Sequence, residues 1–102
     1  MLPHSFTINL QQGSSIWPHP IIPLHLNPRF AHQGGRHVIC RNSWTNGKWG
    51  KEERIESQAD FMPGKNFDLA IACQDQSYQI YLNGMFIADY PFRCDGKLVD
   101  TV

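Results

Sequence analysis

The chain has 102 residues, 41% of them hydrophobic and 18% charged, which fits one compact domain, residues 1–102, that buries roughly two-thirds of its unfolded surface. Nine Lys and Arg residues balance nine Asp and Glu residues, so the chain has no overall field that would attract nucleic acid. No apolar run approaches the roughly 20 residues of a membrane helix, which argues against membrane insertion.

The cysteines and the start of the chain bear on the cellular compartment. Cys40, Cys73 and Cys94 are odd in number and widely spaced, so neither a disulfide framework nor a CxxC zinc pattern is expected. Residues 1–12 lack the basic and then apolar layout of a signal peptide. We therefore predict a cytoplasmic protein, or an extracellular one that leaves the cell by a non-classical route.

Extended segments and turn signals alternate from the start of the chain. Apolar residues at every second position of "SFTINL", residues 5–10, are typical of a half-buried strand. The prolines of "WPHPIIP", Pro18, Pro20 and Pro23, are expected to exclude both a helix and an interior position in a sheet. We therefore predict an irregular segment that leads into a strand over residues 24–30.

The rest of the chain predicts hairpins. Two extended segments, "HVICRNS" and "WGKEERIE", flank Asn46-Gly47, a pair in which both residues accept positive φ. "NFDLAIAC" alternates in the same way, and Asn83-Gly84 joins two more strands within "YQIYLNGMFIADY". No segment has a sustained helical period, and strands separated by turns at about 8 to 12 residues predict an all-β antiparallel sandwich or barrel.

A row of polar side chains stands out in "HLNPRF", residues 25–30. Alternate side chains of a strand share a face, so His25, Asn27 and Arg29 would point one way, and the leucines and Phe30 the other. A polar row on a sheet can simply face water. Whether this row binds a ligand therefore depends on what lies beside it.

Four further residues give the polar row the character of a binding site: Asn42, Trp49, Glu52 and Arg54. Arginine offers a rigid fork of donors, glutamate accepts, and a flat tryptophan can cover the C–H face of a sugar ring. Trp49 has odd parity in its strand whereas the two charged residues have even parity, so we predict a bend or bulge near Gly50 that brings them together. The set fits a neutral ligand rich in hydroxyl groups.

These residues resemble those of the galectins, the β-galactoside-binding lectins with a two-sheet jelly-roll sandwich. The resemblance rests on H-x-N-x-R from His25 to Arg29, on Asn42, and on W-G-x-E-x-R from Trp49 to Arg54, with matching spacings between the pieces. "FTINL", "NPRF", "YLNG" and "YPFR" match as well, so the likeness runs over nearly the whole chain. It implies an antiparallel galectin or concanavalin-like sandwich that binds sugar through His25, Asn27, Arg29, Asn42, Trp49, Glu52 and Arg54.

The resemblance also implies how galactose is distinguished from other sugars. His25, Asn27 and Arg29 would hold the axial 4-hydroxyl of galactose, and Trp49 would stack under its ring. Glucose has an equatorial 4-hydroxyl and would leave these groups unpaired, at about 1 to 3 kcal/mol for each buried one. The implied ligands are lactose and N-acetyllactosamine types of glycan.

The remaining implied contacts extend beyond the 4-hydroxyl. Asn42 and Glu52 would take the 6-hydroxyl of galactose, and Arg54, together with Glu52, would reach the second sugar. The resemblance implies β-galactoside glycans of glycoproteins or glycolipids as partners, reversible binding without cofactor or metal, and multivalency through a homodimer or a tandem domain.

The chain departs from the family pattern at three places. Gln33 stands where many relatives carry a histidine that contributes to the site, and Phe92 stands before Arg93 where histidine is common. Family domains also have further strands before "SFTINL" and after "KLVDTV", so the chain is expected to be shortened at both ends, as a fragment or a natural short form. Missing terminal strands would expose sheet edges.

Other classes of function fit these residues less well than a lectin does. A glycosidase needs two carboxylates that face each other across the bond, whereas Glu52 and Glu53 are adjacent and would point to opposite faces, so no enzyme is predicted. The five histidines show no HExxH or zinc-finger spacing. Cys40 is interpreted as a small apolar residue, and Trp17 and Trp44 are interpreted as packing or loop aromatics. The alternative is a galectin-like protein-interaction module with weak or lost sugar binding.

Overall fold

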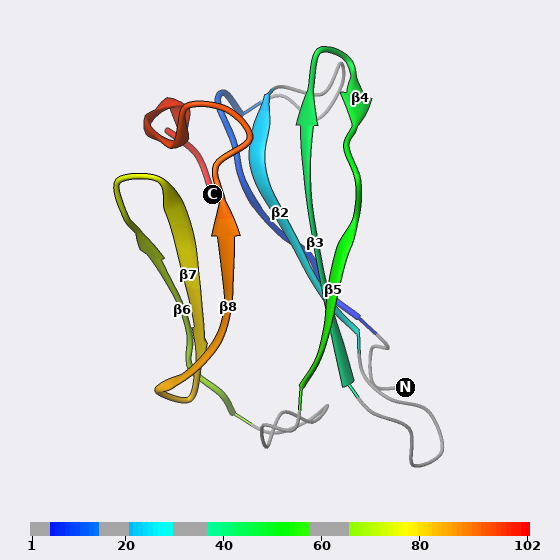
Figure 1. Ribbon diagram of the computed structural model, residues 1–102, viewed down its shortest axis with the longest axis vertical. Coiled ribbons are helices and arrows are strands. Elements are labelled where there is room, and N and C mark those ends of the chain that lie inside the picture. The colour runs from blue at the N-terminus through cyan, green and yellow to red at the C-terminus, as the bar shows by residue number, and fades with distance from the viewer. Residues whose placement is uncertain (1–4, 15–20, 30–36, 58–65) are drawn as a thin grey trace.

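The computed structural model describes residues 5–14, 21–29, 37–57 and 66–102, which form two antiparallel β-sheets packed face to face (Figure 1). One sheet contains β1 (Ile8–Leu10), β2 (Ile22–Arg29), β3 (His37–Thr45), β4 (Lys48–Trp49) and β5 (Glu53–Ser57). The other contains β6 (Leu69–Cys73), β7 (Ser77–Leu82) and β8 (Met85–Pro91), and a 3-10 turn at Gly96–Leu98 follows. The predicted all-β, two-sheet antiparallel sandwich is confirmed. Within the described ranges, no helix has the length and apolar character needed to span a membrane.

The long strand β3 organises the larger sheet. β2 lies between β1 and β3, and β3 pairs on its other side with β4 at one end and β5 at the other. In the smaller sheet β7 lies between β6 and β8. The strand predicted as one segment over "WGKEERIE" is therefore divided in two, with residues 50–52 between its parts.

Both predicted Asn-Gly hairpin turns are present. Asn46 and Gly47 have φ values of 54° and 76°, and Asn83 and Gly84 have 52° and 79°. Two consecutive residues with positive φ match the right-handed twist of the flanking strands, which explains why these pairs join β3 to β4 and β7 to β8.

The core lies between the sheets and follows the predicted alternation of β2. Leu26 and Ile39 from the larger sheet pack against Ile80 and Ala88 from the smaller one, and all four are buried. Leu24 of the larger sheet forms a second buried cluster with Tyr78 and Tyr90 of the smaller sheet. The polar row of β2 therefore faces away from the core. Phe30, expected on the core side, lies outside the described residues.

The prediction that Pro23 would be kept out of the interior of a sheet is wrong. Pro23 lies inside β2, which has neighbours on both sides. The pairing of β2 with β3 shifts register between Ile22 and His25, so a residue without an N–H group is tolerated at this irregularity. The Pro23 carbonyl oxygen still accepts a hydrogen bond of 2.7 Å from Ser43 Oγ. Pro18 and Pro20 lie outside the described residues.

Truncation of the core should be costly, and truncation at its edge should not. Ile80 is fully buried, so Ile80→Ala is expected to lower the free energy of unfolding by about 2 to 5 kcal/mol through lost burial and the cavity left behind. The matched change Met85→Ala, at a side chain that is 59% exposed, should cost less than about 0.5 kcal/mol. Urea denaturation measures both, and similar losses in the two variants would contradict the assigned core.

Candidate functional site

An open hollow of about 460 Å³ lies on the face of the larger sheet that points away from the core, and it is lined by His25, Asn42, Trp49 and Glu52. Strand pairing produces this arrangement. His25 of β2 lies directly opposite Asn42 of β3, and Trp44 of β3 lies opposite Trp49 of β4, so side chains far apart in sequence share one face.

The predicted irregularity at Gly50 is confirmed as a one-residue mismatch between β3 and the chain that returns beside it. Trp44 pairs with Trp49 and Arg41 pairs with Glu53, so two residues of β3 (42 and 43) stand opposite three residues (50–52). This extra residue reverses the parity of the strand. The face that carries the Trp49 indole before the mismatch therefore carries Glu52 and Arg54 after it.

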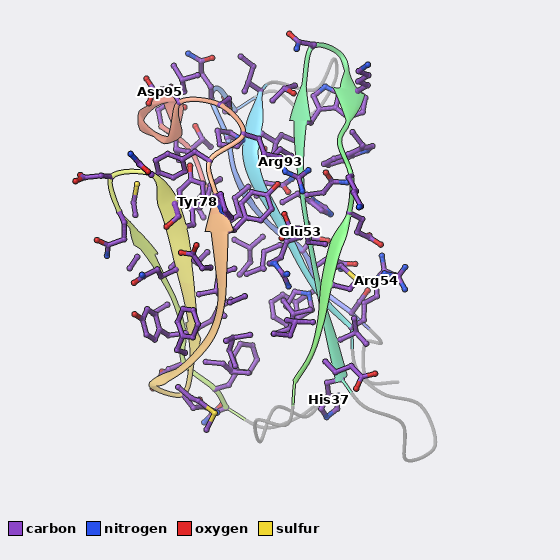
Figure 2. The ribbon with its side chains drawn as sticks, viewed as in Figure 1. His37, Glu53, Arg54, Tyr78, Arg93 and Asp95 are labelled. Carbon is purple, nitrogen blue, oxygen red and sulfur yellow. The ribbon has the colours of Figure 1, made fainter. Side chains whose placement is uncertain are left out.

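The adjacent carboxylates Glu52 and Glu53 have different partners on opposite faces of the sheet, as predicted. Glu52 Oε2 accepts a hydrogen bond of 2.7 Å from Arg54 Nε, and Glu53 Oε2 accepts one of 2.9 Å from Arg93 Nη2. Figure 2 shows Arg54 pointing away from the second sheet, whereas Glu53 and Arg93 lie toward it. The two carboxylates therefore do not face each other across a common substrate.

A chain of hydrogen bonds connects the charged residues beside the hollow. Arg29 Nε donates to Asn27 Oδ1 at 2.7 Å, and Arg29 Nη2 reaches Glu52 Oε1 at 3.4 Å. The hydrogen bond from Arg54 is the main reason that the pKa of Glu52 is lowered, so this carboxylate stays ionised at neutral pH. The Arg29 and Arg54 side chains are 44% and 60% exposed, which leaves guanidinium donors available to a ligand.

Asn27 is held by its surroundings. Its Nδ2 donates to the Phe6 carbonyl oxygen at 2.8 Å and to Thr7 Oγ1 at 3.4 Å, while its Oδ1 accepts from Arg29. Only 9% of Asn27 is exposed. Its amide hydrogens are thus engaged, and its main effect on the face is to fix the orientation of the Arg29 guanidinium.

Asn42 is fixed as firmly but keeps one donor. Its Oδ1 accepts from the Ser43 backbone N–H at 2.8 Å and from Arg93 Nη1 at 2.9 Å, and its Nδ2 donates to the Gly50 carbonyl oxygen at 2.9 Å. An amide nitrogen carries two hydrogens, so one remains for a ligand in the hollow.

His25 joins the polar row to the aromatic part of the site. Its Nδ1 lies 2.7 Å from Asn9 Oδ1, and because an amide oxygen only accepts, Nδ1 is the donor. Its ring centroid is 4.7 Å from that of Trp49, which in turn packs edge-on against Trp44 at 5.2 Å, as expected of a packing residue. The Trp49 side chain is an exposed large hydrophobic group, with 40% of the residue accessible.

The protonation state of His25 follows from its burial. Desolvation lowers the pKa of His25, the nearby Glu52 raises it and Arg29 lowers it, with the net shift downward. The ring is therefore neutral at pH 7, and with the proton on Nδ1 its Nε2 is a hydrogen-bond acceptor. A ligand hydroxyl that donates to Nε2 would be matched to this state.

The structure brings all seven residues predicted from the sequence onto one face: His25, Asn27, Arg29, Asn42, Trp49, Glu52 and Arg54. Cys40 lies among them but is only 1% exposed, and burial raises the pKa of its thiol, in keeping with its predicted role as a small packing residue. Gln33 and Trp17 lie outside the described residues.

Sequence reasoning missed two residues that support the site. Asn9 of β1 lies opposite His25 and fixes its ring, and Arg93, which follows β8, holds Asn42. Both lie in segments noted only as general likenesses, "FTINL" and "YPFR". A polar residue between Ile8 and Leu10 could have signalled the first, whereas the second depends on how the two sheets pack.

This geometry agrees with the comparison against known protein families, in which a model of the galactoside-binding lectins matches residues 1–102. The chain belongs to the galactoside-binding lectin family. Over 99 residues this lectin domain is 40% identical to galectin-4 of Sus scrofa, a match that covers 96% of this chain and 28% of the relative. It is 32% identical to galectin-8 of Rattus norvegicus over 97 residues, or 95% of this chain and 29% of the relative.

Two further comparisons concern another member of the family and a solved structure. A 32 kDa beta-galactoside-binding lectin of Caenorhabditis elegans is 36% identical over 88 residues, which covers 86% of this chain and 29% of that protein. The structure of sheep galectin-11 in complex with glycerol has the same fold, with a TM-score of 0.79 at 22% identity, over 93% of this chain and 65% of that one. The lectin domain spans less than a third of the length of the curated relatives named here.

The state of His25 gives a testable pH dependence for the lectin domain. Because burial lowers its pKa, the unfolded chain takes up a proton near pH 6.5 that the folded state binds only at lower pH. His25 therefore has no effect on the free energy of unfolding above about pH 6.5, and it lowers this free energy as the pH falls below that value. An NMR titration should give a midpoint for His25 below that of the same histidine in a peptide spanning residues 22–29; an equal or higher midpoint would contradict the neutral assignment.

Proposed function

We propose that this domain binds β-galactosides, such as lactose and N-acetyllactosamine glycans, reversibly on the face that carries the hollow. The observation that carries the proposal is the convergence of a neutral histidine, two guanidinium groups and a carboxylate beside one exposed indole. These groups form directional hydrogen bonds, and Glu52 offsets one of the two guanidinium charges, which suits a neutral ligand with many hydroxyl groups.

The axial 4-hydroxyl of galactose fits the donors and acceptors around Arg29. A hydroxyl donates one hydrogen bond and accepts two. In the proposed complex it donates to His25 Nε2 and accepts from the Arg29 guanidinium, which Asn27 holds at 2.7 Å. An equatorial 4-hydroxyl cannot satisfy both groups at once, and an unsatisfied buried polar group costs about 1 to 3 kcal/mol.

The other side chains would complete the contact with a disaccharide. In the proposed complex Trp49 lies under the C–H face of galactose and removes apolar area from water at about 25 cal/mol per Å². Asn42 Nδ2 and Glu52 bind the 6-hydroxyl, and Arg54, held by Glu52 at 2.7 Å, reaches the second sugar. These roles require only reversible binding and involve no metal, cofactor or covalent step.

The site is open, so one disaccharide should bind with modest affinity while water competes for each hydroxyl. We propose that functional strength comes from multivalent binding to glycans of glycoproteins or glycolipids, through a homodimer or a tandem domain. The alternative is a protein-interaction module of the same fold with weak or lost sugar affinity. Loss of sugar affinity is expected when a key arginine, tryptophan or glutamate of the site is replaced. This chain keeps all three, as Arg29, Trp49 and Glu52, which argues against the alternative.

Calorimetric titration with two disaccharides tests the proposal. Lactose should bind at millimolar concentrations or below. Cellobiose, whose single free 4-hydroxyl is equatorial, should bind at least about tenfold more weakly, because the loss of about 1.4 kcal/mol corresponds to a factor of ten. Arg29→Met should weaken lactose binding by a similar factor. Lys48→Ala, at the exposed strand β4, should leave the affinity unchanged.

The titration distinguishes a sugar-binding lectin from a protein-interaction module. Selective binding of lactose that depends on Arg29 supports a galactoside-binding lectin. Absence of binding at tens of millimolar lactose, in protein that unfolds cooperatively, would favour the interaction module. Equal affinity for both disaccharides would contradict recognition of the axial hydroxyl.

A further inference from the structure

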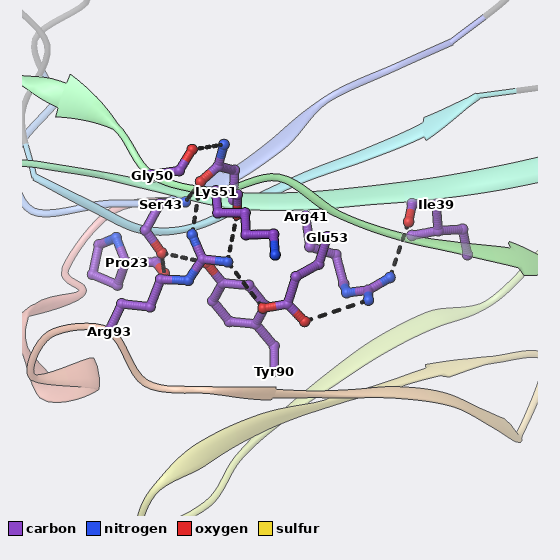
Figure 3. Close-up of polar contacts among 10 residues, drawn as sticks. Pro23, Ile39, Arg41, Ser43, Gly50, Lys51, Glu53, Tyr90 and Arg93 are labelled. Carbon is purple, nitrogen blue, oxygen red and sulfur yellow. Dashed lines mark hydrogen bonds and ion pairs between the residues drawn. The ribbon is translucent and has the colours of Figure 1, made fainter.

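Arg93 reaches the candidate site from the other sheet. It follows β8, yet its guanidinium lies at the mismatch between β3 and the segment 50–52 (Figure 3). There Nη2 donates to the Lys51 carbonyl oxygen at 2.6 Å, and Nη1 donates to Asn42 Oδ1 at 2.9 Å. A residue that follows a strand of the smaller sheet thus forms hydrogen bonds to both sides of the mismatch in the larger sheet.

The surroundings of Gly50 show how closely the Arg93 guanidinium packs against the mismatch. A Cβ atom added to Gly50 would lie 2.7 Å from Arg93 Nη1 and 3.3 Å from Asn42 Oδ1, so any side chain here would displace the arginine or the amide. The absence of a side chain at position 50 and the presence of arginine at position 93 therefore belong to one arrangement.

Further contacts fix the guanidinium on its inner side. Glu53 Oε2 lies 2.9 Å from Nη2, and the guanidinium carbon lies 4.9 Å from the centre of the Tyr90 ring. The Tyr90 hydroxyl is within 2.6 Å of Ser43 Oγ, which ties the same ring to β3. With a side chain only 25% exposed, Arg93 has little freedom to turn away.

We propose that Arg93 is a positioning residue of the carbohydrate site. By holding Asn42 Oδ1 it turns the remaining Nδ2 hydrogen toward the hollow, and by holding the Lys51 carbonyl it sets the segment that carries Glu52. This inference rests on the proposed function, because it assigns Arg93 to recognition of the 6-hydroxyl through Asn42. A lysine is a single compact charge and cannot hold both acceptors with the geometry of a planar fork.

The test compares lactose with its analogue that lacks the galactose 6-hydroxyl, 6′-deoxylactose. The intact chain should bind lactose more tightly than the deoxy sugar. Arg93→Lys and Arg93→Gln should weaken lactose by about tenfold and bring the ratio of the two affinities close to one, because the lost contact is the one that distinguishes the sugars. Calorimetry on protein shown to be folded measures both affinities.

Arg41→Lys is the matched control for a loss of stability. Arg41 also faces Glu53, at 3.7 Å, and is even more buried than Arg93, but it donates to the Ile39 carbonyl oxygen and not to Asn42 or Lys51. The control is expected to lower stability and keep the wild-type affinity ratio. If the Arg93 variants lose affinity for both sugars equally and keep the wild-type ratio, the positioning role is overturned.

A measurement without sugar separates this proposal from the proposed function. In the free protein, Arg93→Lys should shift the NMR signals of the Asn42 side-chain amide and the Gly50 backbone amide by more than Arg41→Lys does, because only Arg93 donates to Asn42 Oδ1. If the intact chain binds no lactose, the proposed function fails and these signals decide whether Arg93 sets the geometry of this face. Unchanged Asn42 signals in Arg93→Lys would overturn the inference in either case.

Discussion

The face with the hollow depends on one extra residue in the chain that returns beside β3. Side chains in a regular strand alternate with a period of two, so without the mismatch Trp49 and Glu52 would point to opposite sides of the sheet. The mismatch also interrupts the ladder, and side chains replace part of it. Asn42 donates to the Gly50 carbonyl and Arg93 to the Lys51 carbonyl, so these backbone acceptors stay satisfied.

The same change of parity sorts the charges of the segment into two groups. Glu52 lies with Arg29 and Arg54 on the outer face, whereas Glu53 lies with Arg41 and Arg93 toward the second sheet. A guanidinium as buried as that of Arg41, at 5% exposure, requires a carboxylate nearby, because a buried charge without a partner is costly. The inner group therefore supports the sandwich, and the outer group is left for a ligand.

Local sequence rules accounted for much of this arrangement. The Asn-Gly pairs fix both turns through positive φ, and the alternation around His25 separates the core face from the polar face. Even the mismatch followed from the conflicting parities of Trp49 and Glu52. The seven predicted site residues needed only these rules and the resemblance to place them on one face.

What the sequence did not predict depends on tertiary structure. Pro23 occupies an interior strand because the register shifts there, and register is a property of two strands rather than one. The contact of Arg93 with Asn42 spans 51 positions and requires the two sheets to be packed. No local period or turn signal encodes such a contact, so "YPFR" pointed to the family without revealing the role of its arginine.

Under the proposed function, the hydrogen bonds among the site side chains explain how an open surface would be selective. Asn27 orients Arg29, Arg54 holds Glu52, and Arg93 and Gly50 fix Asn42, so the donors and acceptors already have their positions before a ligand arrives. Binding then costs little ordering of side chains, but it gains little as well, because water satisfies the same groups. In the proposed complex, discrimination would therefore come mainly from the groups that a wrong sugar leaves unpaired, because rigid side chains cannot turn to a new partner.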